Sequence, residues 1–132
     1  STIVNDGRAE TMSKGNGSGY VAFVLECVVN DRAALDLVMS DLVTSTKANE
    51  PGTHIYEWSI FDDGAKLITY ERFADSDAAL AHHTGFGPFA GRFLTAVTPT
   101  RFVVFGTPKG TLRRALEDAD VTYVTQVGGF HR

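Results

Sequence analysis

Two adjacent histidines and two strand glutamates are the side chains of this sequence best suited to proton transfer. His82 and His83 carry imidazole rings, which titrate near neutral pH, so either ring is a candidate general base. Glu71 and Glu57 interrupt apolar stretches, and such a carboxylate serves as a base where burial raises its pKa. Adjacent helical positions point about 100° apart, so we expect at most one of the histidines to face a cavity. The candidate catalytic residues are His82, Glu71 and Glu57.

Each of these residues also has a structural interpretation. A histidine is as often a surface residue or a hydrogen-bonded core residue as a catalytic one. A carboxylate inside an apolar strand, Glu26 included, usually needs a partner, because an unpaired buried charge is costly. Arg72, Arg101 and Arg92 are the expected ion-pair partners of these glutamates.

Aromatic residues are frequent in the same part of the chain. Rings at strand or helix spacing usually form core, but they also suit the stacking of a planar substrate. We expect the substrate pocket to be lined by Tyr56, Trp58, Tyr70, Phe73, His83, Phe86 and Phe89.

The first half of the chain predicts a strand, a helix and a hairpin. Residues 20–29 are apolar at nearly every position, as in a strand covered on both faces. Asn30 or Asp31 caps a one-sided apolar helix that ends at residues 49–52. Residues 53–61 and 66–73 alternate with a period of two, and the Asp-Asp-Gly sequence between them suits a tight turn.

The second half predicts a helix and a strand, followed by a C-terminal extension. Asp75 or Ser76 caps the helix, which breaks at residues 85–88 and resumes at 89–97, before an apolar strand at 100–106. The order strand, helix, strand, strand, helix, strand is the α+β, ferredoxin-like arrangement with an antiparallel sheet. This domain spans residues 20–107; residues 1–19 are a polar leader expected to be flexible, and residues 108–132 add a helix at 111–118 and a strand at 121–127.

Composition narrows the function classes. The formal net charge of −4 disfavours nucleic acid as a partner, because phosphate binding needs a basic surface. The sequence contains no apolar run of membrane-spanning length, and its first residues lack the charged-then-apolar order of a secretion signal, so we expect no such signal. Cys27 is the single cysteine, which favours a reducing compartment, so we expect a cytoplasmic protein without membrane contact.

The expected sheet carries large apolar residues on both faces, as the neighbours Phe23 and Val24 and the neighbours Phe102 and Val103 illustrate. Two helices cover only one face of a four-stranded sheet. A second copy of the chain would cover the other face, because soluble oligomers are mostly two-fold symmetric. The pattern therefore predicts a homodimer.

Several short blocks are similar to the antibiotic biosynthesis monooxygenase (ABM) and quinol monooxygenase-like family. The blocks are Glu50-Pro51-Gly52, Tyr56-Glu57-Trp58, Tyr70-Glu71-Arg72-Phe73, Asp75-Ser76 and Ala81-His82. The resemblance extends over residues 20 to about 106 and implies a dimeric α/β barrel. It implies no single substrate, since this superfamily includes cofactor-free oxygenases of phenols and quinols, haem-degrading enzymes and domains of unknown activity.

The resemblance favours a cofactor-independent monooxygenase that acts on a small aromatic, phenol-like or quinol-like substrate with molecular oxygen. Such an enzyme needs a base and a dry cavity, and no cofactor or metal, and His82 would be the base or a hydrogen-bond donor. The alternatives are a non-catalytic ligand-binding or interaction module and a haem-binding relative. Haem degradation is disfavoured because the first strand has no asparagine and Phe73 stands where a tryptophan is common.

Overall fold

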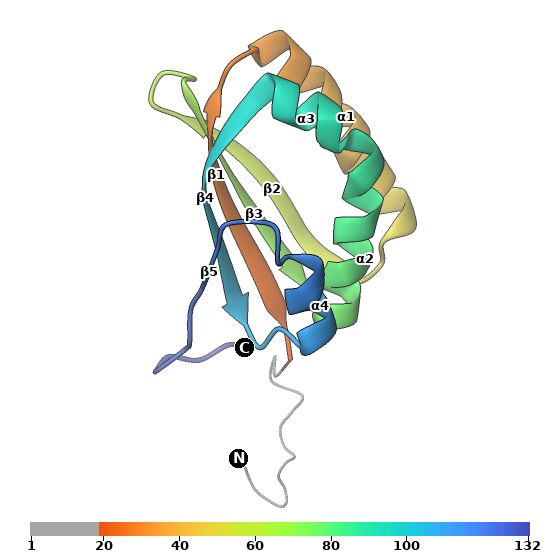
Figure 1. Ribbon diagram of the computed structural model, residues 1–132, viewed down its shortest axis with the longest axis vertical. Helices are drawn as coiled ribbons and strands as arrows, with labels where there is room; N and C mark the ends of the chain where they lie inside the picture. The colour runs from red at the N-terminus through yellow and green to blue at the C-terminus, as the bar shows by residue number, and fades with distance from the viewer. Residues whose placement is uncertain (1–18) are drawn as a thin grey trace, which may run out of the picture.

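One sheet runs through the protein, and helices cover one of its faces (Figure 1). The computed structural model describes residues 19–132, so the predicted leader lies almost wholly outside the described residues. The sheet has five strands in the order β2-β3-β1-β4-β5. Neighbouring strands are antiparallel except for β4 and β5, which are parallel. The strands are β1 (Val21–Val29), β2 (Thr53–Phe61), β3 (Lys66–Phe73), β4 (Val97–Gly106) and β5 (Val121–Tyr123). The predicted ferredoxin-like α+β arrangement is confirmed.

Capping side chains define where the two long helices begin. Helix α1 (Arg32–Asn49) is capped by the Asp31 carboxylate, which accepts a hydrogen bond from a first-turn backbone N–H at 3.0 Å. Helix α2 (Ser76–Phe86) is capped in the same way by Asp75, at 2.9 Å. The structure thus selects one of the two capping residues proposed for each helix. The break predicted after α2 is the short 3₁₀ helix η2 (Gly87–Phe89), which leads into α3 (Ala90–Ala96).

The ends of three elements differ from the sequence prediction. The β2–β3 turn places Asp62 and Asp63, as well as Gly64, at positive φ, whereas only the glycine was expected there. Strand β4 begins at Val97, three residues early, because its first residues continue the pairing with β1 beyond a bulge opposite Glu26 and Cys27. The predicted strand 121–127 is only three residues long, because the chain leaves β4 after Tyr123.

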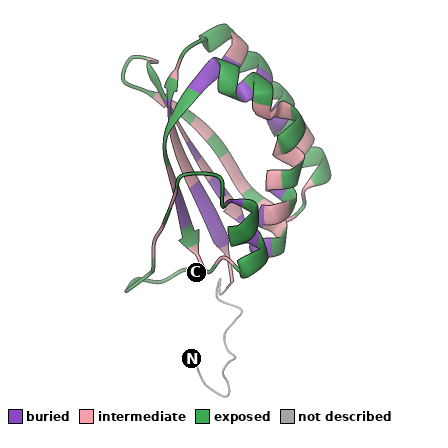
Figure 2. Cartoon of the chain, in the orientation of Figure 1, coloured by how far each residue is buried: buried purple, intermediate pink, exposed green. Residues whose placement is uncertain are grey.

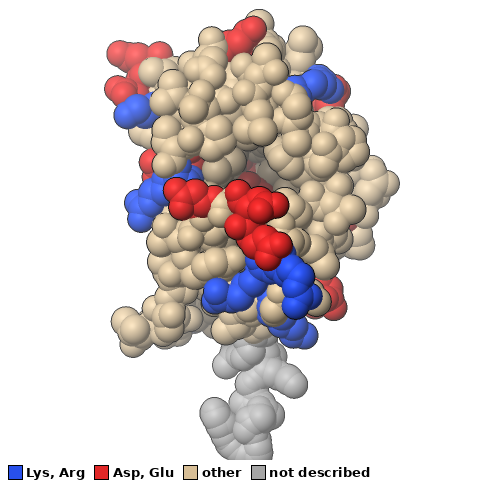
Figure 3. Space-filling view, in the orientation of Figure 1, with Lys and Arg blue, Asp and Glu red and all other residues tan. Residues whose placement is uncertain are grey.

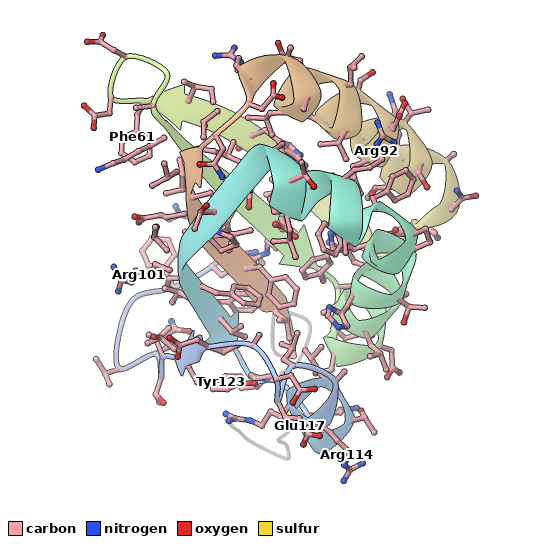
Figure 4. The ribbon with its side chains drawn as sticks, turned by 45° about the horizontal axis from the view of Figure 1, so that its top comes forward. Phe61, Arg92, Arg101, Arg114, Glu117 and Tyr123 are labelled. Atoms are coloured by element: carbon pink, nitrogen blue, oxygen red, sulfur yellow. The ribbon has the colours of Figure 1, made fainter. Side chains whose placement is uncertain are left out.

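The core lies between the sheet and the helices and forms two clusters (Figure 2). One cluster joins α1 and α3 to the sheet through residues such as Leu42 and Phe93. The other includes Leu112 of α4 (Gly110–Ala115) and the nearby Leu116, packed against Val21 and Phe73. On the outside, Arg92 of α3 pairs with Asp41 of α1 at 2.9 Å (Figure 4). The C-terminal extension is therefore part of the packed structure that closes the lower end of the sheet.

The opposite face of the sheet carries no helix (Figure 1). Large apolar side chains are partly exposed there: Val28 is 38%, Phe61 41% and Phe105 38% accessible. The cross-strand partners Tyr70, Val24 and Val103 lie side by side in the middle of this face. We call it the outer face, and the helix-covered one the inner face. No helix among the described residues is long and apolar enough to cross a membrane.

Candidate active site

A cavity of about 380 Å³ lies between the inner face of the sheet and the helices. The strands contribute Phe23, Tyr56 and Trp58, and helices α2 and α3 contribute Phe86 and Phe93. Polar side chains also reach the cavity, and three of them, Thr69, Glu71 and His82, come together on one wall. Mostly apolar walls with a few convergent polar groups are typical of small-molecule sites.

The polar group is built around His82, whose side chain is only 5% exposed. Its Nδ1 lies 2.7 Å from Glu50 Oε1, and its Nε2 lies 3.1 Å from Glu71 Oε1. Glu71 also accepts a 2.8 Å hydrogen bond on Oε2 from the Thr69 hydroxyl, and Glu50 Oε1 accepts one of 3.1 Å from Thr53. One imidazole thus bridges two carboxylates that are themselves 10% and 9% exposed.

Two glycines create the space that this chain of side chains needs. A Cβ on Gly52 would lie 2.6 Å from the Cβ of Ala78, so the glycine lets the start of β2 approach α2. A Cβ on Gly85 would lie 2.7 Å from Glu50 Oε2, so this glycine makes room for the carboxylate beside the helix. The close packing of α2 against the 50–52 segment brings Glu50 to His82.

The two carboxylates control the charge of the ring. Burial of His82 lowers its pKa, but the hydrogen bonds and negative charges of Glu71 and Glu50 more than offset this effect, so the pKa lies above the ordinary value of 6.5. The folded protein therefore holds the proton of this ring more tightly than an ordinary histidine does. Because both nitrogens face carboxylates, a proton from a ligand in the cavity would reach the ring through Glu71. Glu71 and His82 both line the cavity that would hold such a ligand.

Aromatic rings surround this group on the cavity side. The ring centroid of Tyr56 lies 5.0 Å from that of His82 and 5.5 Å from that of Trp58. Burial, together with the charges of Glu71 and Glu50, raises the pKa of the Tyr56 phenol, so this hydroxyl stays protonated. Trp58 Nε1 is buried and has no hydrogen-bond partner among the described residues. Trp58 nevertheless acts as a hydrogen-bond donor toward the Tyr56 oxygen, an effect that opposes the rise in the pKa of that phenol.

Several sequence candidates lie elsewhere. Glu57 is exposed and alternates with Tyr56 and Trp58, so it points to the outer face, away from the cavity. Tyr70 alternates with Thr69 and Glu71 and also belongs to the outer face, so the expectation that it lines the pocket is wrong. The period of two identified two faces for each strand but did not show which face the helices would cover.

Two predicted pocket aromatics support the site from behind. Phe73 is fully buried beneath His82, with ring centroids 5.2 Å apart, and Phe89 packs on the core outside the cavity lining. Phe86 does line the cavity, as expected. His83 lines it together with His82, so the expectation that only one histidine would face a cavity is wrong. The cavity is wide enough to contact two neighbouring positions of α2.

The expected arginine partners are not those observed. Glu71 pairs with His82, and Arg92 pairs with Asp41. Arg72 lies over the ring of Tyr20, with its guanidinium carbon 3.9 Å from the ring centroid, and its buried Nη2 has no partner among the described residues. Cys27 is buried, and burial followed by the charge of Glu71 raises its pKa to about 12, so its thiol is not a nucleophile at neutral pH.

The geometry does not suit His82 as a haem ligand. Iron ligation needs a free imidazole nitrogen, and both nitrogens of this ring already lie within hydrogen-bonding distance of glutamate oxygens. No group of three or more histidine, cysteine, aspartate or glutamate side chains within residues 19–132 is arranged to hold a metal ion.

The C-terminal extension completes the cavity on one side. Leu116, Ala119 and Asp120, which follow α4, line it, and Arg113 of α4 lies 3.9 Å from the Tyr123 ring of β5. Figure 3 shows a hollow on this face with acidic side chains directly below it. Figure 4 places Glu117 and Tyr123 in the same part of the molecule. The mouth of the cavity is thus bordered by a polar and partly acidic segment.

Sequence reasoning missed Glu50, Thr69 and the residues after α4. Glu50 was interpreted as part of a helix stop, although it is the first residue of the Glu50-Pro51-Gly52 block that carries the family resemblance. That block was the available signal for a role in the site. Thr69 gave no signal, because a threonine in a strand is ordinary.

Solved structures share this fold. MupZ from Pseudomonas fluorescens matches with 18% identity and a TM-score of 0.75 over 86% of this chain and 94% of its own. A candidate antibiotic biosynthesis monooxygenase from Caulobacter crescentus matches with 21% identity and a TM-score of 0.61, over 71% and 94%. SnoaB, a cofactor-independent oxygenase from Streptomyces nogalater, matches with 20% identity and a TM-score of 0.60, over 70% and 96%. No model of a protein family and no curated protein matches the sequence. The resemblance to the ABM family is therefore confirmed at the level of the fold.

Proposed function

We propose that this protein is a cofactor-independent monooxygenase that takes a small aromatic substrate with an ionisable hydroxyl, a phenol or quinol. The observation that carries the proposal is the Glu50–His82–Glu71 chain at one wall of a cavity otherwise lined mainly by aromatic and aliphatic side chains. The fold shared with SnoaB, which is described as a cofactor-independent oxygenase, supports it.

The first chemical step is removal of the hydroxyl proton. Glu71 accepts it, and the His82 imidazolium beside Glu71 stabilises the phenolate that remains in the apolar cavity. The aromatic walls hold the ring and exclude water.

The phenolate then gives electrons to molecular oxygen. One oxygen atom enters the ring and the other leaves as water, so a phenol and O₂ yield a quinone and H₂O. The substrate is the reductant, and the proton held on Glu71 returns to the departing oxygen. The protein supplies the base, the compensating charge and the dry cavity.

We propose that a homodimer is the functional form. The outer face exposes Val28, Phe61 and Phe105, and the buried Arg72 Nη2 near this face has no partner within the chain that the structure describes. A buried donor without a partner costs about 1–3 kcal/mol, and an acceptor on a second copy would remove that cost. The apolar and unsatisfied groups therefore favour a second sheet as the cover.

Oxygen consumption with a panel of phenols and quinols tests the proposal. The parent is expected to consume oxygen with at least one of them, and Glu71→Gln to lose about 100-fold or more in kcat/KM. The matched control Asp77→Asn removes an exposed carboxylate on α2 and should behave like the parent. A ligand that binds without oxygen uptake would instead support the non-catalytic binding module, and equal rates for parent and Glu71→Gln would contradict the role of Glu71.

A further inference from the structure

The Glu50–His82–Glu71 chain touches two separate hollows of the molecule. Glu71 and His82 line the substrate cavity inside the sheet. Glu50 instead lines a shallow groove on the outside, between α1 and α2, together with Ser45, Asp77 and Ala81. The buried ring of His82 therefore lies between the cavity on its Nε2 side and the outer groove on its Nδ1 side.

The two oxygens of Glu50 divide between these environments. Oε1 faces His82 Nδ1 at 2.7 Å and also accepts the Thr53 hydroxyl. Oε2 lies against Gly85, a residue of the groove, and no side chain among the described residues donates a hydrogen bond to it. Glu50 Oε2 is not among the buried side-chain atoms that lack a partner within residues 19–132, so this oxygen is accessible to solvent.

We propose that Glu50 is the proton port of the site, through which the buried Glu71–His82 pair exchanges protons with water in the α1–α2 groove. The His82 imidazolium passes its Nδ1 proton to Glu50 Oε1, and Glu50 releases one proton to groove water. The neutral ring keeps its proton on Nε2, and this N–H still donates a hydrogen bond to Glu71, so the Glu71 carboxylate stays in place. Reprotonation of the ring is the reverse transfer, from groove water to Glu50 and from Glu50 to His82. One proton moves in each transfer.

This path has a consequence for the proposed reaction. A substrate that fills the cavity covers Glu71, so solvent cannot reach the pair from that side. The port on the other side lets His82 regain its proton while the cavity is occupied, and the positive charge is then present when the phenolate forms. Glu50 is a positioning and proton-exchange residue and not a catalytic residue, since it does not touch the cavity.

Hydrogen exchange of the His82 ring, followed by NMR in protein labelled with ¹⁵N-histidine, tests the port without substrate or oxygen. The experiment does not require oxygenase activity. Only the role of the port in catalysis rests on the proposed function, so a failure of one can be told from a failure of the other. Glu50→Gln keeps an acceptor for Nδ1–H but cannot carry the proton onward. We expect exchange of the Nδ1 proton to slow by about tenfold or more in this variant.

A purely structural Glu50 predicts the opposite sign. A neutral glutamine forms a weaker hydrogen bond than a carboxylate, so a ring held only by that bond would open more often and exchange faster. The control Asp77→Asn removes the other carboxylate of the groove and should leave the rate unchanged. Unchanged or faster exchange in Glu50→Gln would overturn the proposal.

A second variant covers the case in which Glu50→Gln does not fold. Ala81 is an exposed residue of α2 that lines the groove, so a larger side chain there is compatible with the fold. Ala81→Phe should cover the port and slow Nδ1 exchange while leaving Glu50 in place. Exchange as fast as in the parent would show that protons leave by another route.

Among the described residues, few titratable groups lie around the His82 ring, so a change in its exchange rate can be assigned to one of them. Tyr56 faces His82 from β2, Glu71 faces it from β3, and His83 is its neighbour on α2. Glu50 and Asp77 are the acidic residues of the groove. The raised pKa of the Tyr56 phenol keeps it from acting as the proton carrier at neutral pH.

Discussion

His82 couples the stability of the protein to pH, because its ring is buried between two carboxylates. Burial lowers its pKa, but the hydrogen bonds and charges of Glu71 and Glu50 outweigh this effect and hold the pKa above 6.5 in the folded state. An unfolded histidine titrates near 6.5, so the folded protein binds this proton more tightly. The resulting stabilisation is complete below about pH 6.5 and is lost as the pH rises through the folded-state pKa.

We therefore predict that the free energy of unfolding falls when the pH is raised from about 6 to about 9. The decrease attributable to His82 is about 1.4 kcal/mol for each unit that separates its folded and unfolded pKa values, and it disappears in His82→Gln. Urea denaturation across this range measures it. His54→Gln, which changes an exposed histidine of β2, is the control and keeps the parent's pH dependence. A parent whose stability rises over the same range would contradict the charged, bridging ring.

Particular residues show how far sequence reasoning reaches at this site. His82 and Glu71 were identified because a titratable residue stands out in an apolar stretch. The contact between His82 and Glu71 was not predicted, because residues 11 positions apart on a strand and a helix meet only through tertiary packing. Glu57 looked equivalent to Glu71 in the sequence, and the covering helices alone separate them, by placing one carboxylate on the inner face and the other on the outer face.

The C-terminal part of α2 carries His82, and Gly85 is the position at which this helix lies against the Glu50 carboxylate. An alanine in a helix is normally about 0.5–1 kcal/mol more stable than a glycine. Here the new Cβ would lie 2.7 Å from Glu50 Oε2, so Glu50 must shift from its position on His82.

We predict that Gly85→Ala gains none of this stability and lowers the pKa of His82, because it moves one of the two carboxylates that raise it. The matched variant Gly91→Ala, in α3, has no atom within 4 Å of the added Cβ and should stabilise the protein. Thermal denaturation and NMR titration of His82 measure the two effects. A Gly85→Ala variant that is as stabilised as Gly91→Ala and has an unchanged His82 pKa would contradict the tight packing described.

Elements were predicted well where periodicity and turn chemistry agree. The boundaries of β2, β3 and the two long helices follow from alternation, the Asp-Asp-Gly turn and aspartate caps. The extension was predicted less well. Its alternating residues 121–127 suggested a full strand, but β5 pairs with β4 over only three residues, and no local pattern encodes how much of an edge is available for pairing.

The whole molecule has one face covered by helices and one that is open (Figure 1). Val24 lies in the middle of the open face, paired with Tyr70 on one side and Val103 on the other. A charged residue at this position would be forced into the interface of a face-to-face dimer, where an unpaired buried charge is costly.

We predict that Val24→Arg converts a dimer to a monomer, with little change in secondary structure. Leu37→Arg is the control, because Leu37 is 67% exposed on α1 and lies away from the outer face. Sedimentation equilibrium gives the molecular mass of each variant. A parent that is monomeric at micromolar concentration, or a Val24→Arg variant that remains dimeric, would rule out this interface.

The central claim is that the cavity ionises a small aromatic hydroxyl by means of Glu71 and His82. The most direct test uses a nitrophenol as a chromophoric probe, buffered about one pH unit below its own pKa, with phenolate absorbance recorded as protein is added. The account predicts that binding generates phenolate, lowering the probe's apparent pKa by about one unit or more, and that Glu71→Gln does not. A nitrophenol that binds in the cavity and stays neutral, or that ionises equally in both proteins, would contradict it.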